Sequence, residues 1–447
     1  MNIALLSLEQ TPPLSVPLRF FLTAPLFGLL ASLLLLYDGP HLLMNRWYPS
    51  TLALTHLITL GFITMVMFGA MLQLLPVLAG SPVPRPIFVS STLHILLTLG
   101  TLSLASGFIT GWAWMMVSAL ILLGLSFFGF IGIVAYCLVN VKGRSPTMTG
   151  MRFALGALVI NAMLGIILGM LFVGVVLPLP MVLTNLHLTW GLIGWIGLLI
   201  ISIAYQVVPM FQITPQYPSY LTPWLVPLVF LILFLWTPLD ILVHLNQLPA
   251  TVSQLLIGFI GLGLSIFALV TLNLQAHRLR SIPDVTLNYW RVGMIGLLFS
   301  IILWGVGVFW SDLAMKPFYP VLLGVIFIVG FVLPVIQGML YKIVPFLVWL
   351  HLQNQQLEIT KVISMVKIPN MKQVIPDKFA RRQFWVYIMA LGLTISAVLW
   401  PAGLSDVAGI VLACSFLFLG YNLYKGLWLY RSVSWQIAAA KGKKSDF

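Results

Sequence analysis

Two histidines stand at matching places in long apolar segments of the chain. His56 precedes Pro76 by 20 residues in THLITLGFITMVMFGAMLQLLPVLAG, and His187 precedes Pro209 by 22 residues in NLHLTWGLIGWIGLLIISIAYQVVPMF. Neutral imidazole binds haem iron and copper alike, and an ionisable side chain in an apolar span is a candidate functional group. The spacing therefore makes both histidines candidate metal ligands. The alternative is that each ring donates a hydrogen bond to a carbonyl and needs no cofactor.

A second group of polar residues lies toward the opposite end of the same kind of segment. This group consists of Gln73, Tyr205, Gln206, Tyr341 and Lys342. These side chains could line the inner mouths of pores. Lys342 could also pair with a haem propionate or an anionic substrate. Its simpler role is to extend its ammonium group to the lipid headgroups.

The elements that carry these residues are membrane-spanning helices. Of 447 residues, 61% are hydrophobic and 7% are charged, whereas a soluble domain has about 25% charged residues. The apolar runs are long enough to cross about 30 Å of hydrocarbon as helices. The sequence predicts one all-α membrane domain of twelve spans, near 19–37, 52–79, 88–108, 112–139, 151–177, 185–212, 221–243, 252–276, 290–311, 318–349, 383–402 and 405–430, with a cytoplasmic connector over 350–382.

The distribution of Lys and Arg predicts an orientation, because basic residues are retained on the cytoplasmic side of short loops. With both termini in the cytoplasm, the opposite side holds only Arg46 and Lys316. The cytoplasmic side then holds Arg19, Arg85, Lys142, Arg144, Arg152, Arg278, Arg280, Arg291, Lys361, Lys367, Lys372, Lys378, Arg381, Arg382, Arg431, Lys441, Lys443 and Lys444. The net charge of +13 is thus explained by an anionic lipid leaflet rather than by nucleic acid. We expect a multi-pass protein of a cell's inner membrane.

Three spans end alike, which predicts an internal repeat. The endings LQLLP, YQVVP and YKIVP place Pro76, Pro209 and Pro345 at intervals of 133 and 136 residues. Three units of four helices follow, over approximately 19–139, 151–276 and 290–430. The third unit has Leu323, Gly324 and Val325 where the others have histidine. Alternatively, proline simply ends helices at the membrane interface.

Three four-helix units with histidines near the outer ends of helices two and six resemble subunit I of the haem–copper oxidase superfamily. The segment HLTWGLIGWIGLLIISIAYQVVPMF is similar to the tenth helix of that family. The layout also resembles the NnrS family of haem- and copper-containing membrane proteins. The resemblance implies that His56 matches the helix-two haem ligand and His187 the helix-six copper ligand. It suggests haem b, copper, or both as cofactors.

Departures from the oxidase pattern exclude its catalytic centre. That family uses further histidines of helices ten and seven, and neither PFYPVLLGVIFIVGFVLPVIQGMLYKIVPFLVW nor LTPWLVPLVFLILFLWTPLD contains any. Reduction of dioxygen or nitric oxide by the family's mechanism is therefore not expected. One haem held between His56 and His187 is the sharpest hypothesis. Small residues beside them would admit a flat macrocycle, although such residues also let helices pack closely; they are Gly61, Gly69, Ala70, Gly191 and Gly194.

The expected function is haem or copper binding in electron transfer, sensing or metal handling. A cytochrome c-type protein or another membrane redox protein would be the partner. Two other classes stay open: a cofactor-free small-molecule transporter and a non-catalytic subunit of a membrane complex. Among the other histidines, His94 is expected to bond to a neighbouring helix, and the rest to lie in loops or at span ends.

Overall fold

The protein is an all-helical bundle. The computed structural model describes residues 10–140, 145–176, 180–279, 284–357 and 366–442, and no strand occurs among them. Twelve helices are long and apolar enough to cross a membrane. In chain order the elements are α1 (Ser15–Met44), α2 (Pro49–His56), η3 (Leu57–Thr64), α3 (Met65–Ala79), α4 (Pro86–Thr110), α5 (Ala113–Val139), α6 (Pro146–Leu171), α7 (Pro180–Thr189), η4 (Trp190–Gly197), α8 (Leu198–Gln212), α9 (Leu225–His244), α10 (Ala250–Ala276), α11 (Val285–Phe309), α12 (Ser311–Ala314), α13 (Phe318–Val325), η5 (Ile326–Val332), α14 (Leu333–Leu357), α15 (Met371–Val374), α16 (Asp377–Leu399) and α17 (Pro401–Gly442).

The prediction of a twelve-span membrane protein is confirmed, with corrections at several ends. The fifth span ends at Leu171 rather than near 177, because the chain turns there and Gly174 has a φ of 91°. Helices α14 and α17 run well past residues 349 and 430. Since α16 begins at Asp377, the predicted connector over 350–382 is partly helical. Of the basic residues assigned to the cytoplasm, Lys142, Arg144, Arg280, Lys361, Lys443 and Lys444 lie outside the described residues.

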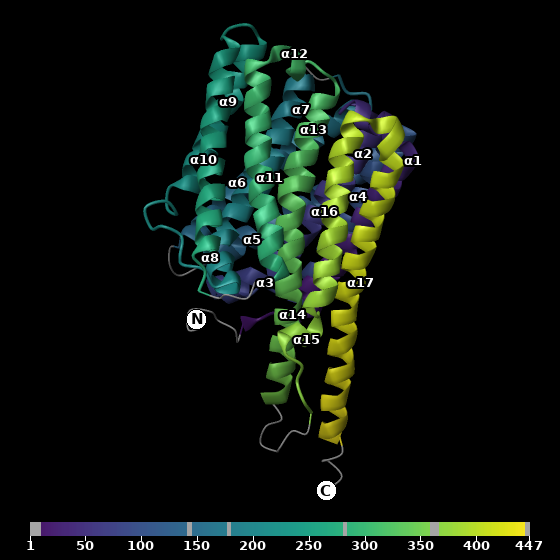
Figure 1. Ribbon diagram of the computed structural model, residues 1–447, viewed down its shortest axis with the longest axis vertical. Coiled ribbons are helices and arrows are strands. Elements are labelled where there is room, and N and C mark those ends of the chain that lie inside the picture. Colours follow the sequence, from purple (N-terminus) through teal and green to yellow (C-terminus); the bar gives the residue numbers. More distant parts are fainter. Residues whose placement is uncertain (1–9, 141–144, 177–179, 280–283, 358–365, 443–447) are drawn as a thin grey trace.

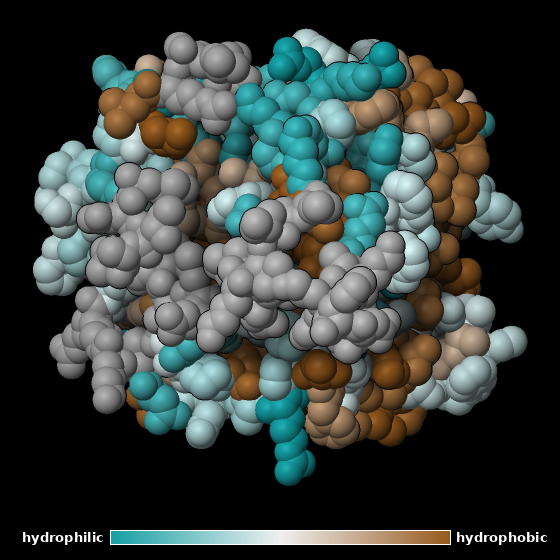
Figure 2. Space-filling model, turned by 90° about the horizontal axis from the view of Figure 1, so that it is seen from below, coloured by the Kyte–Doolittle hydropathy of each residue, from teal (hydrophilic) through white to brown (hydrophobic). Residues whose placement is uncertain are grey.

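Helices α1 and α17 place both ends of the described chain at the same end of the bundle (Figure 1). We call this end the inner end and the opposite one the outer end, after the predicted orientation. Figure 2 views the inner end, where hydrophilic side chains gather over the face and hydrophobic ones line its right edge. Helix α1 packs along α17, so the first and last spans are neighbours.

The second, sixth and tenth spans form the centre of the bundle. In their most apolar windows 78%, 72% and 61% of residues are buried, against 28–50% in the other nine spans. Residues on a central helix contact other helices on all sides instead of lipid. The spans that carry the two histidines are therefore the ones that can enclose a site.

Each central span contains a π-helical segment, a rare geometry that is often found at functional sites. The segments η3, η4 and η5 begin at residues 57, 190 and 326, which are 133 and 136 residues apart. The three prolines recur at the same two intervals. The π-helical segments thus follow the period found in the sequence, while the limits assigned to the three units remain a prediction.

The three prolines do not end their helices. Pro76, Pro209 and Pro345 lie inside α3, α8 and α14, which continue to Ala79, Gln212 and Leu357. Helices α3 and α8 nevertheless end three residues after their prolines, so the alternative that proline marks the end of a span stays open. A proline inside a helix removes one backbone hydrogen bond and bends the helix, so the three central spans share a second local feature.

Candidate functional site

The two predicted ligands lie at the outer ends of two central spans. His56 is the last residue of α2, directly before η3, and His187 lies in the last turn of α7, before η4. Their imidazole centroids are 6.3 Å apart and their planes differ by 18°. Residues separated by 131 positions in the chain (56 to 187) are thus brought next to each other.

One metal ion fits between rings at this separation. A metal–nitrogen bond to imidazole is about 2 Å long, and two such bonds in line leave the two ring centres about 6 Å apart. The observed 6.3 Å agrees with a shared metal held between the rings.

Each ring is oriented by a backbone carbonyl. His56 Nδ1 lies 2.8 Å from the Leu52 oxygen on its own helix, and His187 Nδ1 lies 3.1 Å from the Asn161 oxygen on α6. A carbonyl oxygen only accepts, so each Nδ1 carries the proton and each Nε2 has a free lone pair. Neither Nε2 has a hydrogen-bond partner among the described residues. A ligating histidine has this arrangement, because its other nitrogen usually donates to a carbonyl or carboxylate. The same bond also occurs at His244, His277 and His351, so it agrees equally with the alternative in which no cofactor is bound.

Both rings line a cavity of about 1090 Å³ in the outer half of the bundle. Small-molecule sites typically measure about 300–1,000 Å³, so the cavity admits a ligand the size of a porphyrin. Its walls are mainly apolar, and Arg46 is the only Lys or Arg among the described lining residues, which include no Asp or Glu. Phe108, whose ring centroid is 5.3 Å from that of His56, forms part of one wall. A large, apolar and nearly uncharged space suits a hydrophobic ring system.

Two buried polar atoms on the cavity wall have no partner among the described residues. They are the side-chain oxygen of Asn161 and the indole nitrogen of Trp195, and both residues line the cavity. A buried polar atom left without a hydrogen bond costs about 1–3 kcal/mol. These two atoms are themselves almost inaccessible, so of the polar groups described here only the two Nε2 atoms are candidates for binding a ligand.

The donor set favours a haem over a bare metal ion. No group of three or more His, Cys, Asp or Glu side chains that could hold a metal exists in the part of the chain described. Zinc and copper sites in proteins use three or four protein ligands, and here there are two histidines. A macrocycle supplies its own equatorial nitrogens and needs only axial ligands from the protein. The residues present therefore fit haem.

The third central span contributes space to the same cavity. Leu323, Gly324 and Val325, which replace the histidine in the third unit, all line it. A methyl group added to Gly324 would meet nothing within 4 Å. At the three matching positions the cavity is thus lined by two histidines and by one segment without a histidine.

The predicted inner group lies away from this cavity, since none of its residues is among those that line it. Gln73 and Tyr205 are buried, and their oxygens Oε1 and Oη have no partner among the described residues. Tyr341 accepts a hydrogen bond of 2.9 Å from Asn422. The role of these residues and of Gln206 in lining pores stays a prediction.

Lys342 has a protein partner. Its ammonium nitrogen lies 2.5 Å from Asp284, the N-cap of α11 at the inner end. The charge of Lys342 is therefore balanced within the protein, far along the chain from the two histidines. The remaining span histidine behaves as expected, because His94 Nε2 lies 2.8 Å from the hydroxyl of Thr23 on α1.

Sequence reasoning missed most of the supporting residues. Asn161 and Gly165 lie one turn apart on α6, where the first accepts the His187 hydrogen bond and the second faces the ring. Nothing in the sequence marks either residue, since their role depends on how α6 packs against α7. Arg46 had a signal, because it is one of two basic residues on the predicted outer side.

Comparison with known proteins identifies the fold. A solved structure of a heme-copper terminal oxidase dimer matches with a TM-score of 0.62 at 12% sequence identity, covering 96% of this chain and 84% of the oxidase chain. No protein-family model and no curated protein matches the sequence. The chain therefore has the fold of haem–copper oxidase subunit I, as its helix count and repeat predicted, and at this identity the similarity extends to the fold alone.

Proposed function

We propose that this multi-pass membrane protein binds one haem b between His56 and His187 and transfers electrons. The observation that carries the proposal is the pair of facing imidazoles, 6.3 Å apart across a large apolar cavity, each with Nδ1 bonded to a carbonyl. Such a haem would supply one-electron redox chemistry. His56 and His187 would hold it in a fixed orientation, and the apolar walls would exclude water from it.

Electron transfer is favoured over oxygen reduction by the placement of the ligands. If His56 and His187 both bound the iron, they would leave no coordination position for dioxygen. The further histidines that the oxidase family uses are absent from the seventh and tenth spans. The site is therefore suited to passing electrons, and sensing or metal handling would require one ligand to leave.

The site lies at the predicted outer end, and this suggests where electrons enter or leave. A cytochrome c-type protein outside an inner membrane, or another membrane redox protein, would exchange electrons with it. The termini and the basic inner loops would face the cytoplasm, in agreement with the distribution of Lys and Arg.

Absorption spectra of the purified full-length protein test the proposal. The reduced-minus-oxidised spectrum is expected to show a b-type haem, and a pyridine haemochrome assay about one haem per chain. His56→Ala and His187→Ala should each abolish the low-spin spectrum. His94→Ala is the matched control, because this span histidine bonds to Thr23 and does not line the cavity. Full spectra in both ligand variants would refute shared ligation.

Two other results would favour other functions. A colourless protein that retains copper, and loses it in both ligand variants, would replace haem with copper. A colourless, metal-free protein would favour a transporter, for which the cavity of about 1090 Å³ would be the substrate site.

A further inference from the structure

Cations from two neighbouring helices gather around one aromatic ring at the inner end. Lys425 Nζ lies 4.6 Å and Lys378 Nζ 5.1 Å from the centroid of the Phe379 ring. The guanidinium carbon of Arg382 lies 6.0 Å from the same centroid. Lys425 is on α17, which packs along α16, the helix of the other three residues. We call these four residues the Phe379 cluster. Its three like charges repel one another, so a bound anion would stabilise it.

The protein itself leaves this positive charge unbalanced. Among the described residues, Lys378, Arg382 and Lys425 take part in no ion pair and no hydrogen bond. The carboxylate of Asp377, next to Lys378 in the chain, lies 3.7 Å from Arg381 instead, and both side chains of this pair are about half exposed. An exposed ion pair of this kind contributes little to stability. The cluster therefore has an excess of positive charge at the protein surface.

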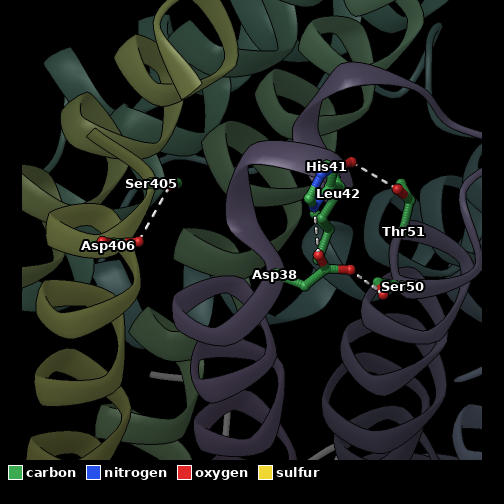
Figure 3. Close-up of polar contacts among 7 residues, drawn as sticks. All are labelled: Asp38, His41, Leu42, Ser50, Thr51, Ser405 and Asp406. Atoms are coloured by element: carbon green, nitrogen blue, oxygen red, sulfur yellow. Dashed lines mark hydrogen bonds and ion pairs between the residues drawn. The ribbon is translucent and has the colours of Figure 1, made fainter. Parts of the chain in front are cut away.

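Most acidic side chains of the described residues lie at the outer end. Asp38 accepts hydrogen bonds from His41 Nδ1, at 2.9 Å, and from the Ser50 hydroxyl, at 2.5 Å (Figure 3). Asp406, at the start of α17, accepts one from Ser405 at 3.4 Å (Figure 3). The others are Asp240 near the end of α9, Asp312 in α12 and, at the inner end, Asp284, which is paired with Lys342.

The outward face of α16 joins the cations to an exposed indole ring. One depression of about 340 Å³ is lined by Lys378, Arg381, Arg382 and Trp385. These residues are three or four positions apart or adjacent, so they share one face of the helix. The side chain of Trp385 is 63% exposed, although its ring is large and mainly apolar. Trp residues of membrane proteins are enriched at the level of the lipid headgroups.

The cations lie at the depth where the hydrocarbon of a membrane would begin. Helix α16 ends at Leu399 on the outer side, and about 20 helical residues cross the hydrocarbon. Counting back from Leu399 by this length reaches Ala380, which lies between Lys378 and Arg382 in the chain. The depression is therefore placed at the inner headgroup level.

Beyond Trp385 the same face becomes apolar and open. Met389, one turn farther along α16, is 52% exposed. A methyl group added at Gly392, two turns farther, would meet nothing within 4 Å. The face thus has cations at one end and an uncovered apolar surface at the other. A molecule with an anionic head and long hydrocarbon chains matches both parts, whereas a soluble anion would leave the apolar part uncovered.

We propose that this face of α16, together with Lys425 of α17, binds an anionic phospholipid of the inner leaflet. The phosphate is held among the three cations of the Phe379 cluster, since Lys and Arg side chains pair well with phosphate oxygens. Trp385 lies beside the glycerol, and the acyl chains follow Met389 and Gly392. The inference does not depend on the proposed haem function.

Native mass spectrometry of the full-length protein in a neutral detergent tests this site, because it resolves the binding of single lipids. The wild-type protein should bind the first dioleoyl phosphatidylglycerol about 5- to 30-fold more tightly than the first dioleoyl phosphatidylcholine. The double variant Lys378→Gln, Arg382→Gln should lose this preference. The double variant Arg85→Gln, Arg291→Gln is the matched control and should keep it, because it removes two exposed basic residues of the predicted inner side that belong to α4 and α11.

A single variant on the second helix tests the same site independently. Lys425→Gln should weaken the preference for phosphatidylglycerol by about fivefold, and it decides the inference if the double variant in α16 does not fold. Melting temperatures in phosphatidylcholine alone, equal to that of the wild type, would show that the variants are folded.

Three results would overturn the inference. If both double variants lose the preference equally, net charge alone attracts the lipid. If neither the double variant in α16 nor Lys425→Gln changes it, the lipid binds elsewhere. If an excess of glycerol phosphate, which has no acyl chains, displaces the phosphatidylglycerol, the site takes soluble anions and not a lipid.

Discussion

Adding one methyl group at Gly165 tests whether the position of the His187 ring determines ligand binding. A Cβ at this residue would lie 3.0 Å from His187 Cε1, 3.6 Å from Nδ1 and 3.9 Å from Nε2. Carbon atoms prefer to be about 3.5–4.0 Å apart, so the ring must move by a few tenths of an ångström. The ring of His187 cannot move freely, because its Nδ1 is bonded to the carbonyl oxygen of Asn161, which lies one turn before Gly165 on α6.

The expected effect of Gly165→Ala follows from this displacement. Functional groups must be held within about 0.5 Å of their productive positions, and returning the ring to its original place on binding would reinstate up to about 1–3 kcal/mol of overpacking. Since 1.4 kcal/mol is tenfold, haem affinity should fall by at most about 150-fold. The axial bond to His187 should weaken, and part of the low-spin spectrum should change to a high-spin form.

Haem titration, followed by absorption, measures both effects. Gly124→Ala is the matched control, because it lines the same cavity but its new methyl would have only an ordinary contact of 3.9 Å with Ile166. If Gly165→Ala binds haem with wild-type affinity and spectrum, the ring of His187 does not hold the ligand from the position described. Equal losses in both glycine variants would instead indicate a general effect on the cavity.

Three further predictions concern stability, read as thermal unfolding of the purified protein. Gly296→Ala should lower the free energy of unfolding by about 3 kcal/mol or more, and with it the melting temperature, because its Cβ would lie 2.3 Å from the backbone oxygen of Gly330 in η5. In Gly305→Ala, on the same helix, the new methyl group meets nothing within 4 Å, so this control should be tolerated. Asp284→Ala should destabilise more than Asp284→Asn, since both lose the ion pair with Lys342 but only alanine also loses the side-chain cap of α11, worth about 1 kcal/mol; equal effects would contradict this account of the cap. Removal of bound haem should destabilise by about 4 kcal/mol relative to protein at a thousandfold excess of ligand over Kd, and His56→Ala should unfold at the same temperature with and without haem.

The fold could be predicted because its signals are local. Runs of apolar residues set the twelve spans, and the recurrence of Pro76, Pro209 and Pro345 set the period. Both signals depend on composition and order alone, since lipid obliges the backbone to form helices. The ends of helices were less predictable. Helix α17 continues to Gly442, for example, because nothing in the sequence stops it at the membrane surface.

Of the candidate site, only the two histidines that the repeat places at matching positions could be predicted from the sequence. His56 and His187 were recognised because each occupies the outer end of a span with the same ending. The residues that orient them were not, because the hydrogen bond from His187 to Asn161 depends on packing between two helices that the repeat does not relate. The π-helical segments also had no signal of their own, although each contains glycine, such as Gly61 in η3 and Gly330 in η5.

Under the proposed function, the matching positions of the three central spans explain why one haem and not three would be bound. All three positions line one cavity, and only the first two hold a histidine. The third holds Gly324 with open space beside it, which would leave room for the ring. The departure from the repeat is therefore the apolar third position, which under the proposal limits the cavity to a single pair of ligands.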